Sequence, residues 1–517
     1  MKKTNPNVLT AFLLAAFIPA LFSCAAGSSA PREDAEVINM YIFVSDGTYR
    51  NVDSVVEEFE KRTRGSLNID LNIHTMSIHD YRDRMVLIAS TGTEADLVFD
   101  APWINMTSLI QKKAYKELSG YFDNPELGGL RRAFPPEFLD SNRFYGGIYG
   151  IPIMNAPLDI QGIFYRKDLA DKYGLVIENY DSLRVYFETV LSREKGMIPM
   201  GVQNSRGFYF MFDAPLNMAL KNIYVLEGIT GGGRELFSVG ISADGRRVTG
   251  VSCYGDTLDS YSRYLPPYNT FEGFNRYFLE AAQWNRYIPE DSVMQESVDP
   301  LFLNGYAAAT EGTIGDFAEH QADLANRLPG AELGFWPYID EIRNREKGVI
   351  ALSFRAWNYL CIPQNSVKTE KVFQFLNWVF ESQENNDLFS FGLQASDIPE
   401  EETYQFPGYE LTWNPRFIHI PANLPDDIKG LLEYQYAPDS FRRIPVSGFV
   451  LDEQEIITEL SHIRAIYEKY RNALLCGVYE NPAAVLREMN SEMESAGLGK
   501  VKGEIARQIQ AFLDADI

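Results

Sequence analysis

An alternation of two hydrophobic periods near the start of the globular part constrains the fold most. Apolar residues recur at every second position from Ile38 to Val44, and then at helical spacing from Val52 to Phe59. The same order follows once more, with a strand expected over 67–75, a helix over 81–90 and a short strand over 97–99. A strand-helix-strand-helix-strand series predicts a parallel sheet, so we assign the chain to the α/β class.

The loops after these strands are the first candidates for a binding site. In a parallel sheet, ligands lie beyond the carboxyl ends of the strands. Here those ends are followed by Asp46-Gly47 and by Asp100 and Trp103. Asp46-Gly47 is equally compatible with a simple turn, and Trp103 with packing in a core or between lobes.

The N-terminus carries an export signal. Lys2 and Lys3 precede an apolar stretch from Val8 to Phe22, which is too short to span a membrane comfortably. The stretch ends in Leu21-Phe22-Ser23-Cys24, which resembles the bacterial lipobox. We therefore expect a signal peptide over 1–23, a diacylated Cys24 and a flexible tether over 24–36; cleavage near Ala30 and an uncleaved anchor are the alternatives.

Composition limits the classes of function. Apolar residues make up 45% of the chain, which is enough for two packed lobes, and a net charge of −24 argues against nucleic acid as a partner. Besides Cys24 there are three cysteines, Cys253, Cys361 and Cys476, and no disulfide is predicted. The five histidines lack metal-ligand spacing, so we expect no metal and no cofactor.

Two local patterns indicate elements further along the chain. Asp244-Gly245, between apolar stretches, predicts a β-hairpin over 241–248. A stripe of apolar residues at helical spacing predicts a long helix with one buried face: Ile456, Leu460, Ile463, Tyr467 and Tyr470. Gly231-Gly232-Gly233 lacks the lysine and serine or threonine of a phosphate-binding loop, which favours a flexible loop.

Several motifs, taken in order, resemble the extracellular solute-binding proteins of ABC importers, in particular the sugar-binding and oligosaccharide-binding lipoproteins with an extended C-terminal region. The resemblance covers nearly all of the chain after the leader. The matching stretches are Asp96-Leu97-Val98-Phe99 with Trp103, Gly147 to Pro152, Phe164 to Leu169, Phe302 to Ala308, Ile362-Pro363 with Ser366, Phe375 to Trp378, and Ala496 to Val501.

The resemblance implies a two-lobed periplasmic-binding-protein-like (type II) fold, in which discontinuous segments form each lobe around a ligand cleft. Lobe one is expected over 37–157 and 355–392, and lobe two over 158–354 and 393–517. The chain is expected to cross between the lobes near 153–159 and 353–357. Closure of the lobes on a ligand would be the signal that the importer reads.

The family's pattern, carried over by position, implies a set of ligand-facing residues whose carboxylate, amide, guanidinium and indole groups suit sugars. The candidates are Asp46, Asp100, Trp103, Asn155, Gln203, Asn204, Glu311, Trp336, Arg355 and Trp357. The implied partners are a small ligand, ABC permease subunits and, through the lipid, a membrane; the protein is expected to be monomeric and extracytoplasmic.

The sequence leaves other functions open. Tyr306 stands where relatives often carry lysine, and residues 196–268 match the family only loosely, so the ligand's identity does not transfer. A peptide or charged ligand, a surface carbohydrate-active enzyme and a sensory lipoprotein remain as alternatives. Acidic pairs such as Glu57-Glu58 lie in charge-rich stretches, which favours a solvated face over paired acid-base catalysis.

Overall fold

The structure is a computed structural model, and most of the chain after the leader is described. The described residues are 35–44, 52–91, 94–154, 158, 160–204, 206–208, 211–212, 222–226, 236–295, 299–348, 350–393 and 412–515. The leader with Cys24, most of the tether, Asp46, Asn155 and Gly231–Gly233 lie outside these ranges.

The N-terminal sheet has the strand order β2-β1-β3-β12-β4. β1 (Glu36–Val44) pairs in parallel with both β2 (Ile69–Ser77) and β3 (Leu97–Asp100), as the hydrophobic alternation predicted. Two strands from later in the chain complete the sheet: β12 (Asn358–Cys361) lies antiparallel between β3 and β4 (Ile151–Ile153). The sheet is therefore mixed.

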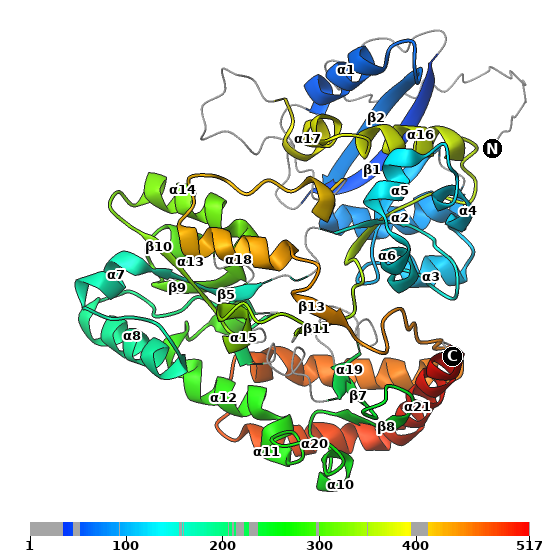
Figure 1. Ribbon diagram of the computed structural model, residues 1–517. Helices are drawn as coiled ribbons and strands as arrows, with labels where there is room; N and C mark the ends of the chain where they lie inside the picture. The colour runs from blue at the N-terminus through cyan, green and yellow to red at the C-terminus, as the bar shows by residue number, and fades with distance from the viewer. Residues whose placement is uncertain are drawn as a thin grey trace, which may run out of the picture.

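Helices cover this sheet and complete lobe one, in the upper right of Figure 1. Its apolar cluster runs from Ile38 to Met154 and resumes from Ala356 to Phe389. The helices are α1 (Val52–Thr63), α2 (Ile78–Thr91), α3 (Met106–Gln111), α4 (Ser119–Phe122), α5 (Gly128–Ala133), α6 (Pro136–Ser141), α16 (Thr369–Val379) and α17 (Gln383–Phe391).

The second lobe contains an antiparallel sheet of order β10-β5-β9. Central β5 (Gln161–Arg166) pairs with β9 (Ala309–Thr313) on one side and β10 (Leu333–Pro337) on the other. The associated helices are α7 (Lys167–Lys172), α8 (Tyr180–Arg193), α13 (Asp299–Leu303), η3 (Ile314–Asp316), α14 (Phe317–Arg327), α15 (Asp340–Arg343) and α18 (Asp426–Tyr436).

The lower part of lobe two combines a second small sheet with the C-terminal helices (Figure 1). β6 (Ile223–Val225), β7 (Phe237–Ile241) and β8 (Val248–Cys253) are antiparallel, and the predicted hairpin turns at Gly245 with φ +76°. The helices are α10 (Leu258–Tyr261), α11 (Phe271–Phe274), α12 (Arg276–Trp284), η1 (Asn285–Tyr287), η2 (Ser292–Met294), α19 (Ile457–Leu475), α20 (Pro482–Ser495) and α21 (Leu498–Ala515). The predicted stripe on α19 is buried throughout, which confirms its assignment to the core.

Among the described residues, the apolar side chains form two separate clusters, and the chain passes between these clusters three times. The first passage joins β4 to β5 through 154–160, and the second joins β11 (Ile350–Leu352) to β12 through 353–357. The third lies between Phe417, packed in lobe one near η6 (Pro415–Phe417), and Leu424 in lobe two. The expected assignment of all of 393–517 to lobe two is therefore wrong for Trp413 and Phe417, whose rings pack against the first cluster.

Beside the second passage, β11 pairs in parallel with β13 (Phe441–Arg443). Cys253, Cys361 and Cys476 are buried and free. Within the described ranges, no group of His, Cys, Asp and Glu side chains has the geometry of a metal site, and no helix has the length and apolar character to cross a membrane.

Candidate ligand-binding site

Two indoles and an amide gather at one edge of the lobe-one sheet. β12 runs antiparallel to β3, so its amino end lies beside the carboxyl end of β3. There the Nε1–H of Trp103 donates a hydrogen bond to Oδ1 of Asn358, at 3.0 Å. Trp357, the residue before β12, is 63% exposed, which leaves its ring face free to stack on a ligand.

A carboxylate and two amides gather at an edge of the lobe-two sheet. The segment that ends in Gln203 and Asn204 runs parallel to β9, with bridges from Ile198 to Ala307 and from Gly201 to Thr310. Parallel neighbours end at the same edge, so both side chains lie near the end of β9 that carries Glu311. All three side chains are partly exposed.

Tyr338 orients the Glu311 carboxylate. Its hydroxyl donates to Oε1 of Glu311, at 3.1 Å. Burial raises the pKa of Tyr338 well above its usual value, and the charge of Glu311 adds to this, so the phenol keeps the proton that it donates.

The first passage connects the two edges. β4 ends at Ile153, opposite Asn358 of lobe one, and β5 begins at Gln161, opposite Thr313 at the end of β9. A short connection therefore joins the edge that carries the indoles to the edge that carries Glu311. This geometry suits a ligand held between lobes.

Two cavities lie elsewhere. One of about 70 Å³ lies between the lobes beside the third passage, and Gly315 and Trp413 are among the residues that line it. It is too small for a drug-sized ligand, which needs about 300 Å³ or more. The other, of about 540 Å³, lies among α4, α5 and α6 and is lined by lobe one alone, so a ligand there would not join the lobes.

Asp100 does not face a ligand, which corrects the prediction from the sequence. Its side chain is fully buried. Oδ2 accepts from the hydroxyl of Tyr115 at 2.6 Å, and Oδ1 accepts from the N–H groups of Ala101 at 2.7 Å and Asn105 at 3.1 Å. Oδ1 thus holds the loop that leads into α3, and Oδ2 ties Asp100 to Tyr115 beyond that helix, so the side chain has a structural role in lobe one.

Trp336 and Arg355 also have structural positions. Trp336 is 3% exposed, and Arg343 lies over its ring at 4.5 Å. The guanidinium group of Arg355 donates to three main-chain carbonyl groups: those of Ser141 at 3.3 Å, Arg143 at 3.0 Å and Phe449 at 3.1 Å. Arg355 uses three of its five N–H donors to join lobe one to the C-terminal region, and Trp336 packs in the core of lobe two, so both side chains have structural roles.

Of the predicted set, the structure brings Trp103 and Trp357 together at one edge, and Gln203, Asn204 and Glu311 at the other. Asp46 and Asn155 are outside the described residues. Sequence reasoning missed Asn358 and Tyr338. Tyr338 lies two positions after Trp336, so a period of two offers a signal for it once the strand is known. Asn358 directly follows Trp357, and the period offers no signal for it.

Part of the chain matches a model of a known protein family. Residues 47–220 match the family model described as bacterial extracellular solute-binding protein. The two-lobed fold confirms the architecture expected from the sequence, and over these residues the chain is similar to extracellular solute-binding proteins. Residues 445–514 match a separate model, a domain of unknown function named DUF3502.

Particular relatives share this architecture. A carbohydrate ABC transporter substrate-binding protein of Streptococcus pneumoniae serotype 4 is 23% identical over 504 residues, covering 94% of this chain and 92% of that protein. The crystal structure of the N-glycan transport solute binding protein from Streptococcus pneumoniae has a TM-score of 0.69 at 18% identity, covering 93% of this chain and 100% of that chain. An alginate-binding protein solved without calcium ion has a TM-score of 0.61 at 14% identity, covering 93% and 99%.

Proposed function

We propose that this protein is a lipid-anchored extracytoplasmic binding protein that captures an oligosaccharide and delivers it to an ABC importer. The observation that carries the proposal is the pair of polar and aromatic edges, one on each lobe, that the first passage connects. One edge carries the indoles of Trp103 and Trp357, and the other carries Glu311 with Gln203 and Asn204. A ligand that contacts both edges stabilises the closed arrangement of the lobes.

The chemistry of the edges suits a sugar. Indole faces stack on the apolar faces of pyranose rings, while carboxylate and amide groups bond to neighbouring hydroxyl groups.

The relatives support the same ligand class. The pneumococcal structure has been solved in complex with Man1GlcNAc and with Man5GlcNAc, at TM-scores of 0.64 and 0.62 to this chain. The relative from serotype 4 is described as a carbohydrate substrate-binding protein. We extend to this chain the class of ligand, and leave the particular glycan to experiment.

The anchor and partners follow from the N-terminal pattern and the family. Cys24 would carry the lipid, the permease subunits of an ABC importer would receive the ligand, and the protein would act as a monomer without a cofactor. The matched family is extracellular, which supports a position outside the cytoplasm.

We propose binding without turnover. Hydrolysis of a glycoside uses a pair of carboxyl groups roughly 5–10 Å apart. Among the described residues assigned here to the two edges, Glu311 supplies the single carboxylate, and the relatives described above are binding proteins.

A thermal-shift screen tests the proposal. Full-length protein in detergent is screened against Man1GlcNAc, Man5GlcNAc, maltotetraose, alginate oligomers, peptides and amino acids. A bound ligand raises the melting temperature by mass action, and about 100 Kd of ligand adds about 2.7 kcal/mol. A shift with a glycan that is recovered intact supports capture; a shift with peptides alone, or cleavage of the glycan, contradicts it.

A further inference from the structure

The C-terminal region of unknown function, residues 445–514, is built into lobe two. Residues on α19, α20 and α21 belong to the same apolar cluster as β5 and β9, among them Leu474, Met489 and Ile505. We propose that the turn after α19, Leu475–Gly477, positions Gln203, Asn204 and Arg206–Phe208, and with them the lobe-two half of the ligand site. These residues are called the segment 203–208 below; Ser205 lies outside the described residues. This inference rests on the proposed function, because the segment carries Gln203 and Asn204.

The turn contacts the segment through the backbone. The N–H of Phe208 donates to the carbonyl oxygen of Leu475, at 3.0 Å. Gly207 has φ +52°, and a Cβ at this position would lie 2.2 Å from the same carbonyl oxygen. The close approach therefore requires glycine, and it fixes the end of the segment against the C-terminal region.

Cys476 lies beneath the other end of the segment. Its Sγ is 3.9 Å from the carbonyl oxygen of Asn204. Burial raises the pKa of the Cys476 thiol to about 11, and the charge of Glu311 adds to this. The thiol therefore stays neutral, and it packs as a small buried group under the part of the cleft that carries Asn204 and Glu311.

The turn itself is fixed from its other side. The side-chain amide of Asn285 donates to the carbonyl oxygen of Cys476, at 2.9 Å, and the hydroxyl of Tyr277 donates to that of Leu475, at 3.4 Å. Gly477 has φ +67°, and a Cβ there would lie 2.1 Å from the carbonyl oxygen of Ala281. The turn is thus wedged between α12 and the segment, and it has little freedom to move independently of either.

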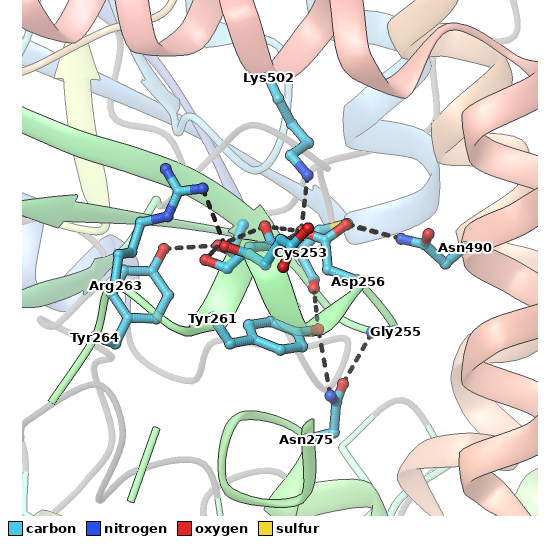
Figure 2. A network of polar contacts seen from close by, with 12 residues as sticks. Cys253, Gly255, Asp256, Tyr261, Arg263, Tyr264, Asn275, Asn490 and Lys502 are labelled. Carbon is cyan, nitrogen blue, oxygen red and sulfur yellow. Dashed lines mark hydrogen bonds and ion pairs between the residues drawn. The ribbon is translucent and has the colours of Figure 1, made fainter. Parts of the chain in front are cut away.

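A second anchor of the C-terminal region supplies a matched control. Figure 2 shows Asp256 accepting from Asn490 of α20 and Lys502 of α21, at 3.0 Å and 2.8 Å. Ser260 and the N–H of Cys253 also donate to this carboxylate. None of these residues belongs to the turn or to 203–208, so this network stabilises the region without touching the ligand segment.

Hydrogen–deuterium exchange on ligand-free full-length protein in detergent tests the inference. We compare Cys476→Leu, which adds volume beneath Asn204, and Asn285→Ala, which releases the turn without altering it, with the control Lys502→Met. We expect the amides of 203–208, that of Phe208 above all, to exchange about tenfold faster in the first two variants and at the wild-type rate in the control. All three variants should have lower melting temperatures.

Titration with Man5GlcNAc then measures the consequence. If wild type binds this glycan, Kd should rise about tenfold in Cys476→Leu and Asn285→Ala and stay unchanged in Lys502→Met. If the amides of 203–208 exchange at the wild-type rate in Asn285→Ala and in folded Cys476→Leu, the turn does not position the segment. This outcome does not depend on which ligand the protein binds. A wild type that binds no glycan of the panel contradicts the proposed function alone, since the exchange result stands without a ligand.

Discussion

At the scale of single residues, hydrogen bonds that a polar side chain already makes to the backbone limit what it can offer to a ligand. The Arg355 guanidinium joins lobe one to the C-terminal segment through the carbonyl groups of Arg143 and Phe449, and it also lies over the ring of Phe144 at 4.7 Å. An arginine with its donors engaged in this way holds the backbone in place. Its effect should therefore appear in stability first.

We predict that Arg355→Met lowers the free energy of unfolding by about 2 kcal/mol, because three carbonyl groups lose a charged donor. Urea unfolding measures the change, and Arg442→Met in exposed β13 serves as the control with little effect. If Arg355→Met has unchanged stability but no longer binds glycan, Arg355 contacts the ligand instead.

Asp100 predicts a pH dependence. Burial raises its pKa to about 6, although Tyr115, Ala101 and Asn105 donate hydrogen bonds that act in the opposite direction. The folded protein thus holds this proton more tightly than the unfolded chain, whose aspartates titrate near pH 4. The contribution of protonated Asp100 to the free energy of unfolding is therefore fully present below about pH 4. It is lost as the pH rises to about 6, a change on the order of 2–3 kcal/mol.

In Asp100→Asn, which keeps the shape but does not titrate, the free energy of unfolding should fall less steeply between pH 4 and pH 7. Urea unfolding at several pH values gives both slopes. Equal slopes for the variant and wild type would show that this carboxyl group does not titrate as described.

At the scale of elements, α21 is anchored by one buried ion pair. Nζ of Lys502 lies 2.8 Å from Oδ2 of Asp256, which is 3% exposed at its side chain. Lys500, on the same helix, pairs with Glu459 while its own side chain is 55% exposed. Solvent screens the second pair, whereas removal of Lys502 leaves a buried carboxylate without its counter-charge.

We predict that Lys502→Met destabilises the fold by about 3 kcal/mol and that Lys500→Met changes stability little. Thermal and urea unfolding of the two variants, compared side by side, measure the difference. Equal effects would show that the pair with Asp256 is no stronger than a surface pair.

Elements with a clear period were predictable from the sequence, while contacts between distant segments were not. The parallel strands β1, β2 and β3, the hairpin of β7 and β8, and the buried stripe of α19 each follow from local spacing. The pairing of β12 with β3 appears only in the structure. The family resemblance implied that the chain crosses between the lobes near 353–357, but it did not imply this pairing. Periodicity marks a tryptophan as apolar but does not say whether it is buried like Trp336 or exposed like Trp357.

At the scale of the whole molecule, the passages between the lobes are where closure must occur. In the second passage Phe354 has φ +54°, a strained conformation for a residue with a side chain. Its ring packs against Phe138 of lobe one and Phe441 of β13, with centroids 5.1 Å apart in each case. A packed and strained connection of this kind favours a few discrete lobe arrangements over continuous motion, which suits a protein that signals its ligand by closing.

Oligosaccharide capture can be tested by calorimetric titration. Full-length wild type and Trp357→Ala are titrated with Man5GlcNAc and with the other glycans of the panel. We expect wild type to bind one of these glycans at a single site with a Kd in the micromolar range, about −8 kcal/mol. Trp357→Ala removes an exposed ring without disturbing a core, so we expect it to bind the same glycan about tenfold more weakly. Equal binding by the two proteins would show that Trp357, at the edge of the lobe-one sheet, does not contact the ligand. A wild type that binds none of the glycans would contradict the assignment of this chain to oligosaccharide capture.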